Sequence, residues 1–217
     1  MNFAAARLNM VDSQLRPNKV ADQGLLSAFL AVPRERFVPS LFHEAAYSDD
    51  DLPLGGGRSL LEPMILGRLL ETAAITPGDS VLDIVCASGY GTAIMARLAA
   101  HVTGVEEDTE LARQARARLA ELGVLHAEIV EGRLTDGHKA GAPYDVIAIE
   151  GAVAAIPNAI AAQLADGGRL VAVVRTGAGV GLATVMSRVS GVLSHRPLFD
   201  AACPMLPGFA APPSFVF

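Results

Sequence analysis

Residues 80–91 read SVLDIVCASGYG, and this stretch decides the fold class. The apolar run from Ser80 to Val85 predicts a short buried strand. The small residues that follow predict a tight turn, and Thr92–Ala100 has the composition of a helix. A strand, a small-residue turn and a helix form the repeating unit of a parallel sheet that helices cover on both faces.

The same alternation continues toward the C-terminus. Strands are predicted at Val102–Glu106, Ala127–Glu131, Asp145–Glu150 and Arg169–Val174, with weaker candidates at Ala183–Val189 and Ser194–Ala202. Helices are predicted between Asp108, a candidate N-cap, and Gly123, a candidate C-cap, and over Pro157–Leu164. We therefore expect an α/β fold with a Rossmann-like, doubly wound, mostly parallel sheet. The tail from Pro204 is expected to pack along the surface.

The N-terminal third has a different pattern. It contains two helical segments, a loop rich in Asp and Gly, and a helix opened by a proline: Phe3–Leu15, Asp22–Leu30, Ser48–Ser59, and Pro63 onward to Ala74. We divide the chain into an N-terminal helical extension with a substrate-side loop, residues 1–75, and a core, residues 76–217. The N-terminal helices could cover an active site or form a homodimer contact, and the sequence leaves both open.

Composition excludes several classes of protein. Of the 217 residues 51% are hydrophobic and 18% are charged, which indicates a folded chain with one sizeable core. The net charge of −6, without a basic cluster, disfavours a nucleic-acid partner. Cys86 and Cys203 have no paired spacing and the histidines are scattered, so we expect no metal site, no disulfide and a cytoplasmic location. The N-terminus lacks the apolar run of a signal peptide or a membrane span.

Three features predict a nucleoside site at the carboxyl ends of the first two core strands. Asp83 lies within the first strand, residues 86–89 (CASG) let backbone approach a ligand, and Glu106 ends the second strand, 23 residues after Asp83. An acid at that place can accept hydrogen bonds from both ribose hydroxyls, whether of NAD or of S-adenosylmethionine. Each feature also has a purely structural explanation: a strand-end carboxylate, a helix cap and a tight connection.

Several motifs between about Arg34 and Val174 resemble those of the protein-L-isoaspartate methyltransferase family, in the same order. They are Arg36-Phe37-Val38-Pro39 (family R-x-F-x-P), Ala46-Tyr47-Ser48-Asp49 with Leu52-Pro53-Leu54-Gly55 (A-Y-x-D and L-P-I-G), Gly57-Arg58-Ser59-Leu60-Leu61-Glu62-Pro63 (G-Q-T-I-S-Q-P), Ser88-Gly89-Tyr90 (S-G-Y), Pro143-Tyr144-Asp145 (P-F-D), and Gln163-Leu164 with Gly167-Gly168-Arg169-Leu170-Val171 (Q-L and G-G-R-L-V).

The resemblance implies a class I methyltransferase fold and a cofactor, S-adenosylmethionine. It also implies a repair reaction on a protein or peptide, in which the α-carboxyl of an L-isoaspartyl residue is methylated and the ester closes to a succinimide. Cofactor contacts are expected from Asp83, Ser88, Gly89, Tyr90, Glu106, Gly132 and Arg133. On the substrate side the resemblance places Ser59 and Arg58, with Arg58 as a candidate partner of the substrate carboxylate.

The departures from the family pattern fall on functional positions. Leu61 replaces a serine, Val85 and Ala87 replace the first two glycines of the turn, and Arg133 replaces an aspartate. The family's T-A-A after the fourth core strand is Glu150-Gly151-Ala152. A β-branched residue is costly where the backbone needs a positive φ.

Three hypotheses remain at this stage. The first is an S-adenosylmethionine-dependent carboxyl methyltransferase. The second is a descendant that keeps the fold, has lost cofactor binding or catalysis, and acts as a binding or regulatory module; Leu61, Val85 and Arg133 favour it. The third, an oxidoreductase on a similar fold, is disfavoured because residues 85–91 do not match the dinucleotide pattern G-x-G-x-x-G.

Overall fold

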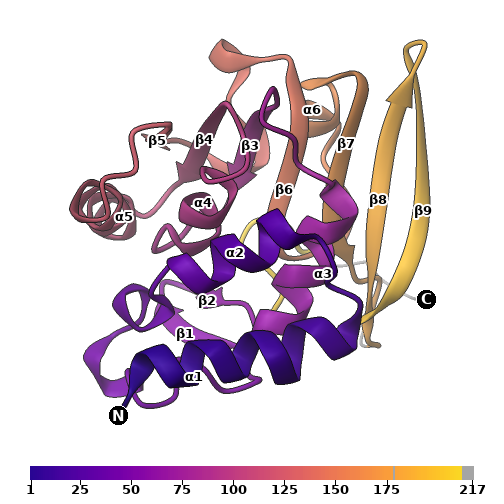
Figure 1. Ribbon diagram of the computed structural model, residues 1–217. Coiled ribbons are helices and arrows are strands. Elements are labelled where there is room, and N and C mark those ends of the chain that lie inside the picture. The colour runs from indigo at the N-terminus through magenta and orange to yellow at the C-terminus, as the bar shows by residue number, and fades with distance from the viewer. Residues whose placement is uncertain (178, 212–217) are drawn as a thin grey trace, which may run out of the picture.

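A seven-stranded sheet forms the centre of the molecule (Figure 1). The computed structural model describes residues 1–177 and 179–211. The strand order is β5-β4-β3-β6-β7-β8-β9. The strands are β3 (Ser80–Ile84), β4 (His101–Glu106), β5 (Ala127–Glu131), β6 (Tyr144–Val153), β7 (Leu164–Val174), β8 (Gly181–Val189) and β9 (Val192–Ala201). The first five are parallel, and β8 and β9 add an antiparallel hairpin at one edge. The predicted doubly wound, mostly parallel sheet is confirmed.

The sheet is apolar on both faces because each face carries its own core. Along the strands, one set of alternate residues joins the larger core and the other set joins the smaller one, as the two-residue period of a strand requires. Val81 and Val146 belong to the first set, and Leu82 and Ile147 to the second. This arrangement explains why the strands read as continuous apolar runs in the sequence.

Helices cover the two faces unequally. The larger core lies under α3 (Pro63–Ala73), α4 (Tyr90–Met95) and α5 (Thr109–Glu121). The smaller core is closed by α6 (Asn158–Ala161), the 3-10 turn η5 (Leu134–Asp136) and the C-terminal tail. The proline at the start of α3 and the Asp108 side chain, which accepts hydrogen bonds from two backbone N–H groups of α5, begin these helices as the sequence predicts.

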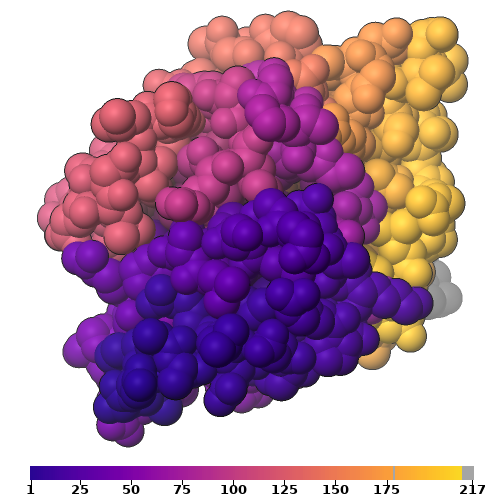
Figure 2. All heavy atoms as spheres, viewed as in Figure 1, coloured from indigo at the N-terminus to yellow at the C-terminus, as the bar shows by residue number. Residues whose placement is uncertain are grey.

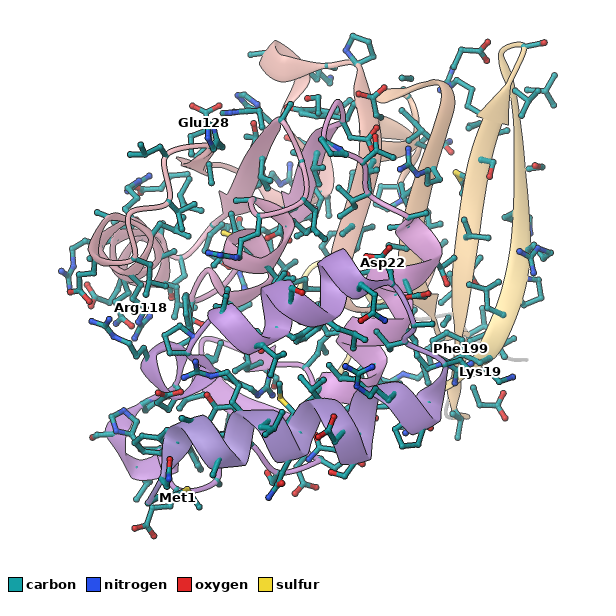
Figure 3. All side chains as sticks on the ribbon, viewed as in Figure 1. Met1, Lys19, Asp22, Arg118, Glu128 and Phe199 are labelled. Carbon is teal, nitrogen blue, oxygen red and sulfur yellow. The ribbon has the colours of Figure 1, made fainter. Side chains whose placement is uncertain are left out.

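A second helical layer packs on the first and covers the lower front of the molecule (Figure 2). It contains α1 (Phe3–Met10), which continues as the π-helical segment η1 (Val11–Leu15), and α2 (Gln23–Ala31). Asp22 is the N-cap of α2 (Figure 3). Short 3-10 turns connect it to the rest: η2 (Arg16–Asn18), η3 (Arg34–Phe37) and η4 (Ser40–Phe42). Another 3-10 turn, η6 (Lys139–Gly141), lies on the surface between β5 and β6.

Arg34 joins the N-terminal segment to α4 from a fully buried position. Its guanidinium donates to the carbonyl oxygens of Ala46 (2.6 Å) and Leu61 (2.8 Å) and lies 5.1 Å from the centroid of the Tyr90 ring. At the other side of the molecule the guanidinium of Arg68, on α3, lies 3.4 Å from the ring centroid of Phe199, on β9 (Figure 3). The first set of contacts joins the N-terminal segment to α4, and the second joins α3 to the edge strand β9.

Three local expectations differ from the structure. Residues 48–59, expected as a loop, contain a two-stranded hairpin of β1 (Leu52–Gly55) and β2 (Arg58–Leu60). Helix α4 ends five residues earlier than predicted, in a turn that returns the backbone N–H of Ala100 to the carbonyl of Asp79. Helix α6 is short because Gln163 and Leu164 already pair with Tyr144 of β6.

The C-terminal tail packs as predicted over the residues that the structure describes. Met205 bridges to Ala152, and the Leu206 and Phe209 side chains are buried in the smaller core. Residues 212–217, the end of that predicted surface segment, lie outside the described residues. Across residues 1–177 and 179–211, the helices all fall short of the length and apolarity that crossing a membrane requires.

Candidate functional site

The strand order reverses next to β3, which lies between β4 and β6. From β3 the chain proceeds outward through β4 to β5, then returns to the other side of β3 with β6 and β7. Ligands of open α/β sheets bind at the carboxyl ends of the strands beside such a reversal. Here that edge carries the turn at residues 85–89, Glu106 at the end of β4, and Gly132, whose N–H donates to the Glu106 carbonyl at 3.1 Å.

The turn after β3 has the positive φ values that glycine favours, although Val85 and Ala87 stand where the family has its first two glycines. Val85 has φ 67°, Ala87 has φ 47° and Gly89 has φ 89°. The N–H groups of Val85 and Cys86 both reach the Val105 carbonyl, at 3.1 and 3.2 Å, so β4 holds the turn in place. A left-handed conformation costs a non-glycine residue about 1–3 kcal/mol, and the surrounding structure must supply that energy.

Glu106 is fully buried and receives hydrogen bonds from three backbone N–H groups. Oε2 accepts from Ala87 at 3.1 Å, and Oε1 accepts from Glu107 and Asp108 at 2.8 and 2.9 Å. The Arg58 guanidinium completes the set: its Nη2 lies 2.9 Å and its Nε 3.1 Å from Oε1. The carboxylate is therefore held on one side by the turn and on the other by the β1–β2 hairpin.

Arg58, expected beside the substrate carboxylate, is paired with Glu106 in the structure. Its side chain is buried, with 6% exposed. The physical reason is the hairpin: it turns Arg58 toward the sheet edge and leaves the neighbouring Ser59, on the opposite side of β2, half-buried. Leu61 is buried in the larger core, and its carbonyl accepts from Arg34.

Two carboxyl groups lie together beneath the turn. Asp83 is fully buried and accepts a hydrogen bond from the Thr92 hydroxyl at 2.5 Å. Burial raises the pKa of Asp83 to about 7, although hydrogen bonds from Thr92 and Glu150 oppose the shift. Burial, together with the charge of Asp83, raises the pKa of Glu150 well above its ordinary range. Two buried carboxyls in contact share a proton.

The other residues expected at the cofactor are dispersed. Ser88 is buried at the turn, and its hydroxyl has no hydrogen-bond partner within the described part of the chain. Arg133 is exposed. The Tyr90 ring lies at the start of α4 and packs edge-on against Phe37, with ring centroids 5.4 Å apart, on the side of the helical layers. Asp83 is covered by Glu150 and Thr92.

Two side chains that were not among the expected cofactor contacts also lie at this edge. Glu150 fills the space in front of Gly91, where a β-carbon would overlap its carboxylate. Leu206, from the tail, fills the space over Gly151, where a β-carbon would lie 2.6 Å from its Cγ. The only signal in the sequence is the pairing of a large residue with a glycine, and it is too common to identify contacts.

In the described residues, 1–177 and 179–211, no group of three or more His, Cys, Asp or Glu side chains is arranged to hold a metal ion. Both cysteines are free and buried. The polar groups at this edge include the Glu106 carboxylate, the Arg58 guanidinium, the Ser88 hydroxyl and backbone N–H groups.

Comparison with known proteins identifies the relatives of this chain. Residues 6–196 match the family described as protein-L-isoaspartate(D-aspartate) O-methyltransferase. A protein-L-isoaspartate O-methyltransferase of Koribacter versatilis is 40% identical over 169 residues, which is 78% of this chain and 76% of that protein. One from Gloeobacter violaceus is 39% identical over 190 residues, 88% of this chain and 93% of that protein. The resemblance seen in the sequence motifs is confirmed.

Solved structures agree on the fold. A protein-L-isoaspartate O-methyltransferase structure has a TM-score of 0.81 at 24% identity and covers 93% of this chain, which in turn spans 66% of it. A Plasmodium falciparum protein described as a β-aspartate methyltransferase in complex with S-adenosyl-L-homocysteine has a TM-score of 0.79 at 18% identity and covers 95% and 98% of the two chains. At these identities the structures support the fold alone.

Proposed function

Because the chain belongs to the protein-L-isoaspartate(D-aspartate) O-methyltransferase family, we propose that it methylates the α-carboxyl of L-isoaspartyl residues in proteins or peptides. The comparisons favour the methyltransferase over the two alternatives, a non-catalytic descendant and an oxidoreductase. The observation that carries the proposal is the meeting of Glu106 with the left-handed turn at residues 85–89, at the point where the strand order reverses.

The residues at this edge fit the family's cofactor, S-adenosylmethionine. Glu106 places a carboxylate where it can accept hydrogen bonds from the ribose hydroxyls. The turn has the positive-φ backbone that lets a ligand approach the main chain closely. The buried Ser88 hydroxyl, which has no partner among the described residues, offers one further polar contact. We propose Glu106, Ser88, Gly89 and Gly132 as the holding residues. Val85 and Ala87 adopt the left-handed conformation that glycine favours, and their side chains are buried at the turn.

The chemistry demands little acid or base catalysis from the protein. When bound, S-adenosylmethionine supplies a methyl group already activated by a sulfonium. This chain's own contribution is to hold a carboxylate in line with that methyl and to exclude water. Ser59, on the half-buried side of β2, can donate a hydrogen bond to the acceptor carboxylate, and the tail residue Leu206 closes the edge above Gly151.

A peptide methylation assay tests the proposal. The protein is incubated with S-adenosylmethionine carrying a radiolabelled methyl group and with a peptide containing one L-isoaspartyl residue; the matched peptide with normal aspartate is the control. We expect base-labile label on the isoaspartyl peptide alone, and its loss in Glu106→Ala. Equal labelling of both peptides would contradict the proposed specificity, and no labelling of either would contradict the activity.

We also propose a cytoplasmic location. Support comes from Cys86 and Cys203, which are both buried as free thiols, the state that a reducing compartment maintains.

A further inference from the structure

The Arg58–Glu106 pair occupies the place that the proposed function assigns to a ribose. The two side chains are 6% and 0% exposed, and the guanidinium lies 2.9 Å from Oε1 through Nη2. A third nitrogen of the same side chain, Nη1, donates to the Gly56 carbonyl at 2.9 Å. All three nitrogens of Arg58 therefore make hydrogen bonds within the protein.

Glu106 has little acceptor capacity left for a ligand. A carboxylate offers about four lone-pair directions. Oε1 receives the N–H groups of Glu107 and Asp108 and also both shorter bonds from Arg58. Oε2 receives the N–H of Ala87 at 3.1 Å, and Nε of Arg58 faces its other side at 3.4 Å. Two ribose hydroxyls would need the directions that Arg58 uses, because the three backbone donors belong to the turn and to the start of α5 and cannot leave without unfolding them. The hydroxyls and the guanidinium therefore compete for the same oxygens.

The segment that carries Arg58 can release it. Gly55, Gly56 and Gly57 form the exposed tip of the β1–β2 hairpin, with φ values of 94°, 56° and 73°. Glycine reaches other backbone conformations at little cost, so the tip can turn while Leu52 and Pro53 stay paired with Leu60 and Ser59. The four-bond side chain of Arg58 adds its own freedom of rotation.

We propose that Arg58 competes with the cofactor ribose at Glu106 and, once displaced, becomes the counter-charge of the acceptor carboxylate. The proposal rests on the proposed function. A guanidinium removed from its acid and left at a buried edge is costly, and it is stabilised again when an anion arrives beside it. The carboxylate of the proposed substrate is such an anion, and Arg58 can bind it in bidentate fashion. Cofactor and substrate must then increase each other's affinity, because binding coupling is reciprocal.

Calorimetric titration with S-adenosyl-L-homocysteine tests the competition between Arg58 and the ribose. This compound contains the same adenosine as S-adenosylmethionine and cannot donate a methyl group. We compare the wild type, Arg58→Gln, and the control Arg113→Gln, which removes an exposed ion pair with Glu110 and changes the charge equally. We expect Arg58→Gln to bind at least tenfold more tightly than the wild type and Arg113→Gln to bind as the wild type does. Equal or weaker binding by Arg58→Gln overturns the competition, whereas absence of binding by all three proteins overturns the proposed function itself.

The second half is tested by repeating the titrations with a saturating L-isoaspartyl peptide. In the wild type the peptide should increase the affinity for S-adenosyl-L-homocysteine at least tenfold, and in Arg58→Gln less than twofold. The same increase in both proteins overturns the counter-charge role. We expect Arg58→Gln to fold, because Glu106 keeps three backbone donors. If Arg58→Gln does not fold, Arg58→Lys replaces it in the test. An ammonium cannot make the two-pronged contact of a guanidinium with Glu106, so Arg58→Lys should also bind S-adenosyl-L-homocysteine more tightly than the wild type.

Discussion

The carboxylate of Glu150 occupies the space in front of Gly91, so that a β-carbon on residue 91 would overlap Oε1 and lie 2.6 Å from Cδ. Gly91 lies in the first turn of α4, where alanine is ordinarily more stabilising by about 1 kcal/mol. Here we expect Gly91→Ala to lower the free energy of unfolding by about 1–3 kcal/mol through overpacking. Urea denaturation measures the change.

The matched test is Gly91→Ala in a Glu150→Thr background, which shortens the opposing side chain. In that background the alanine should be neutral or stabilising. The same destabilisation in both backgrounds would show that Glu150 is not the obstacle.

The shared proton of Asp83 and Glu150 makes stability depend on pH. The pKa of Asp83 is raised by burial from 3.8 to about 7, so the folded protein keeps a proton that the unfolded chain releases. The stability that this proton contributes is fully present below about pH 4 and is lost as pH rises toward 7. The slope in this window is at most about 1.4 kcal/mol per pH unit for one proton.

Urea midpoints measured at intervals between pH 5 and 8 reveal the slope, and Glu150→Gln should flatten it. The substitution removes a carboxyl whose own pKa is raised well above its ordinary range, and with it that group's share of the slope. Glu121→Gln, an exposed substitution at the end of α5, serves as the control and should leave the slope as it is. An unchanged slope in Glu150→Gln would rule out the carboxyl pair as its source.

Glu106 is expected to be essential for stability as well as for binding. Glu106→Gln leaves the Arg58 guanidinium buried without its counter-charge. It also places an amide NH₂, itself a donor, against groups that donate hydrogen bonds to Glu106. Breaking a buried ion pair in this way costs about 3–5 kcal/mol. Thermal and urea unfolding measure the loss, and Arg58→Gln added to Glu106→Gln should restore part of it.

The control for Glu106→Gln is Glu131→Gln, at the end of the neighbouring strand β5. It removes an ion pair with Arg116 in which both side chains are exposed to solvent. That substitution should change stability little. Equal effects of the two glutamate substitutions would contradict the assignment of a structural role to the Arg58–Glu106 pair.

Two alanines, Ala74 and Ala87, have left-handed backbones. Glycine substitutions at these two positions measure the effect of backbone strain separately from that of packing. Ala74 follows α3 with φ 47° and is exposed, so Ala74→Gly should relieve strain and raise the free energy of unfolding by about 0.5–1 kcal/mol. Ala87 has the same φ but is buried in the turn. Ala87→Gly should gain about as much from the backbone as it loses from the buried methyl, about 0.8 kcal/mol, and so change stability little.

Chemical denaturation distinguishes the two substitutions. A destabilised Ala74→Gly would contradict the strain assigned to the left-handed alanines. In Ala87→Gly, tighter binding of S-adenosyl-L-homocysteine without a change in stability would show that the methyl group narrows the cofactor turn.

The sequence by itself determined the alternation of strands and helices, the family, and the turn at residues 85–89. These features are local or consecutive: apolar runs define β3 to β7, Asp108 and Pro63 begin helices through their own side chains, and motifs follow one another along the chain. Even the unfavourable φ of Val85 follows from its place in such a motif.

Only the tertiary structure decided what occupies the site. Arg58 and Glu106 are 48 residues apart, and no pattern indicates that the hairpin tip turns one onto the other. The contact of Glu150 with Asp83 and Gly91, and that of Leu206 with Gly151, likewise join segments that the fold brings together. Such pairings depend on side-chain volume and charge across the sheet edge, so they exist only once the strands have taken their order.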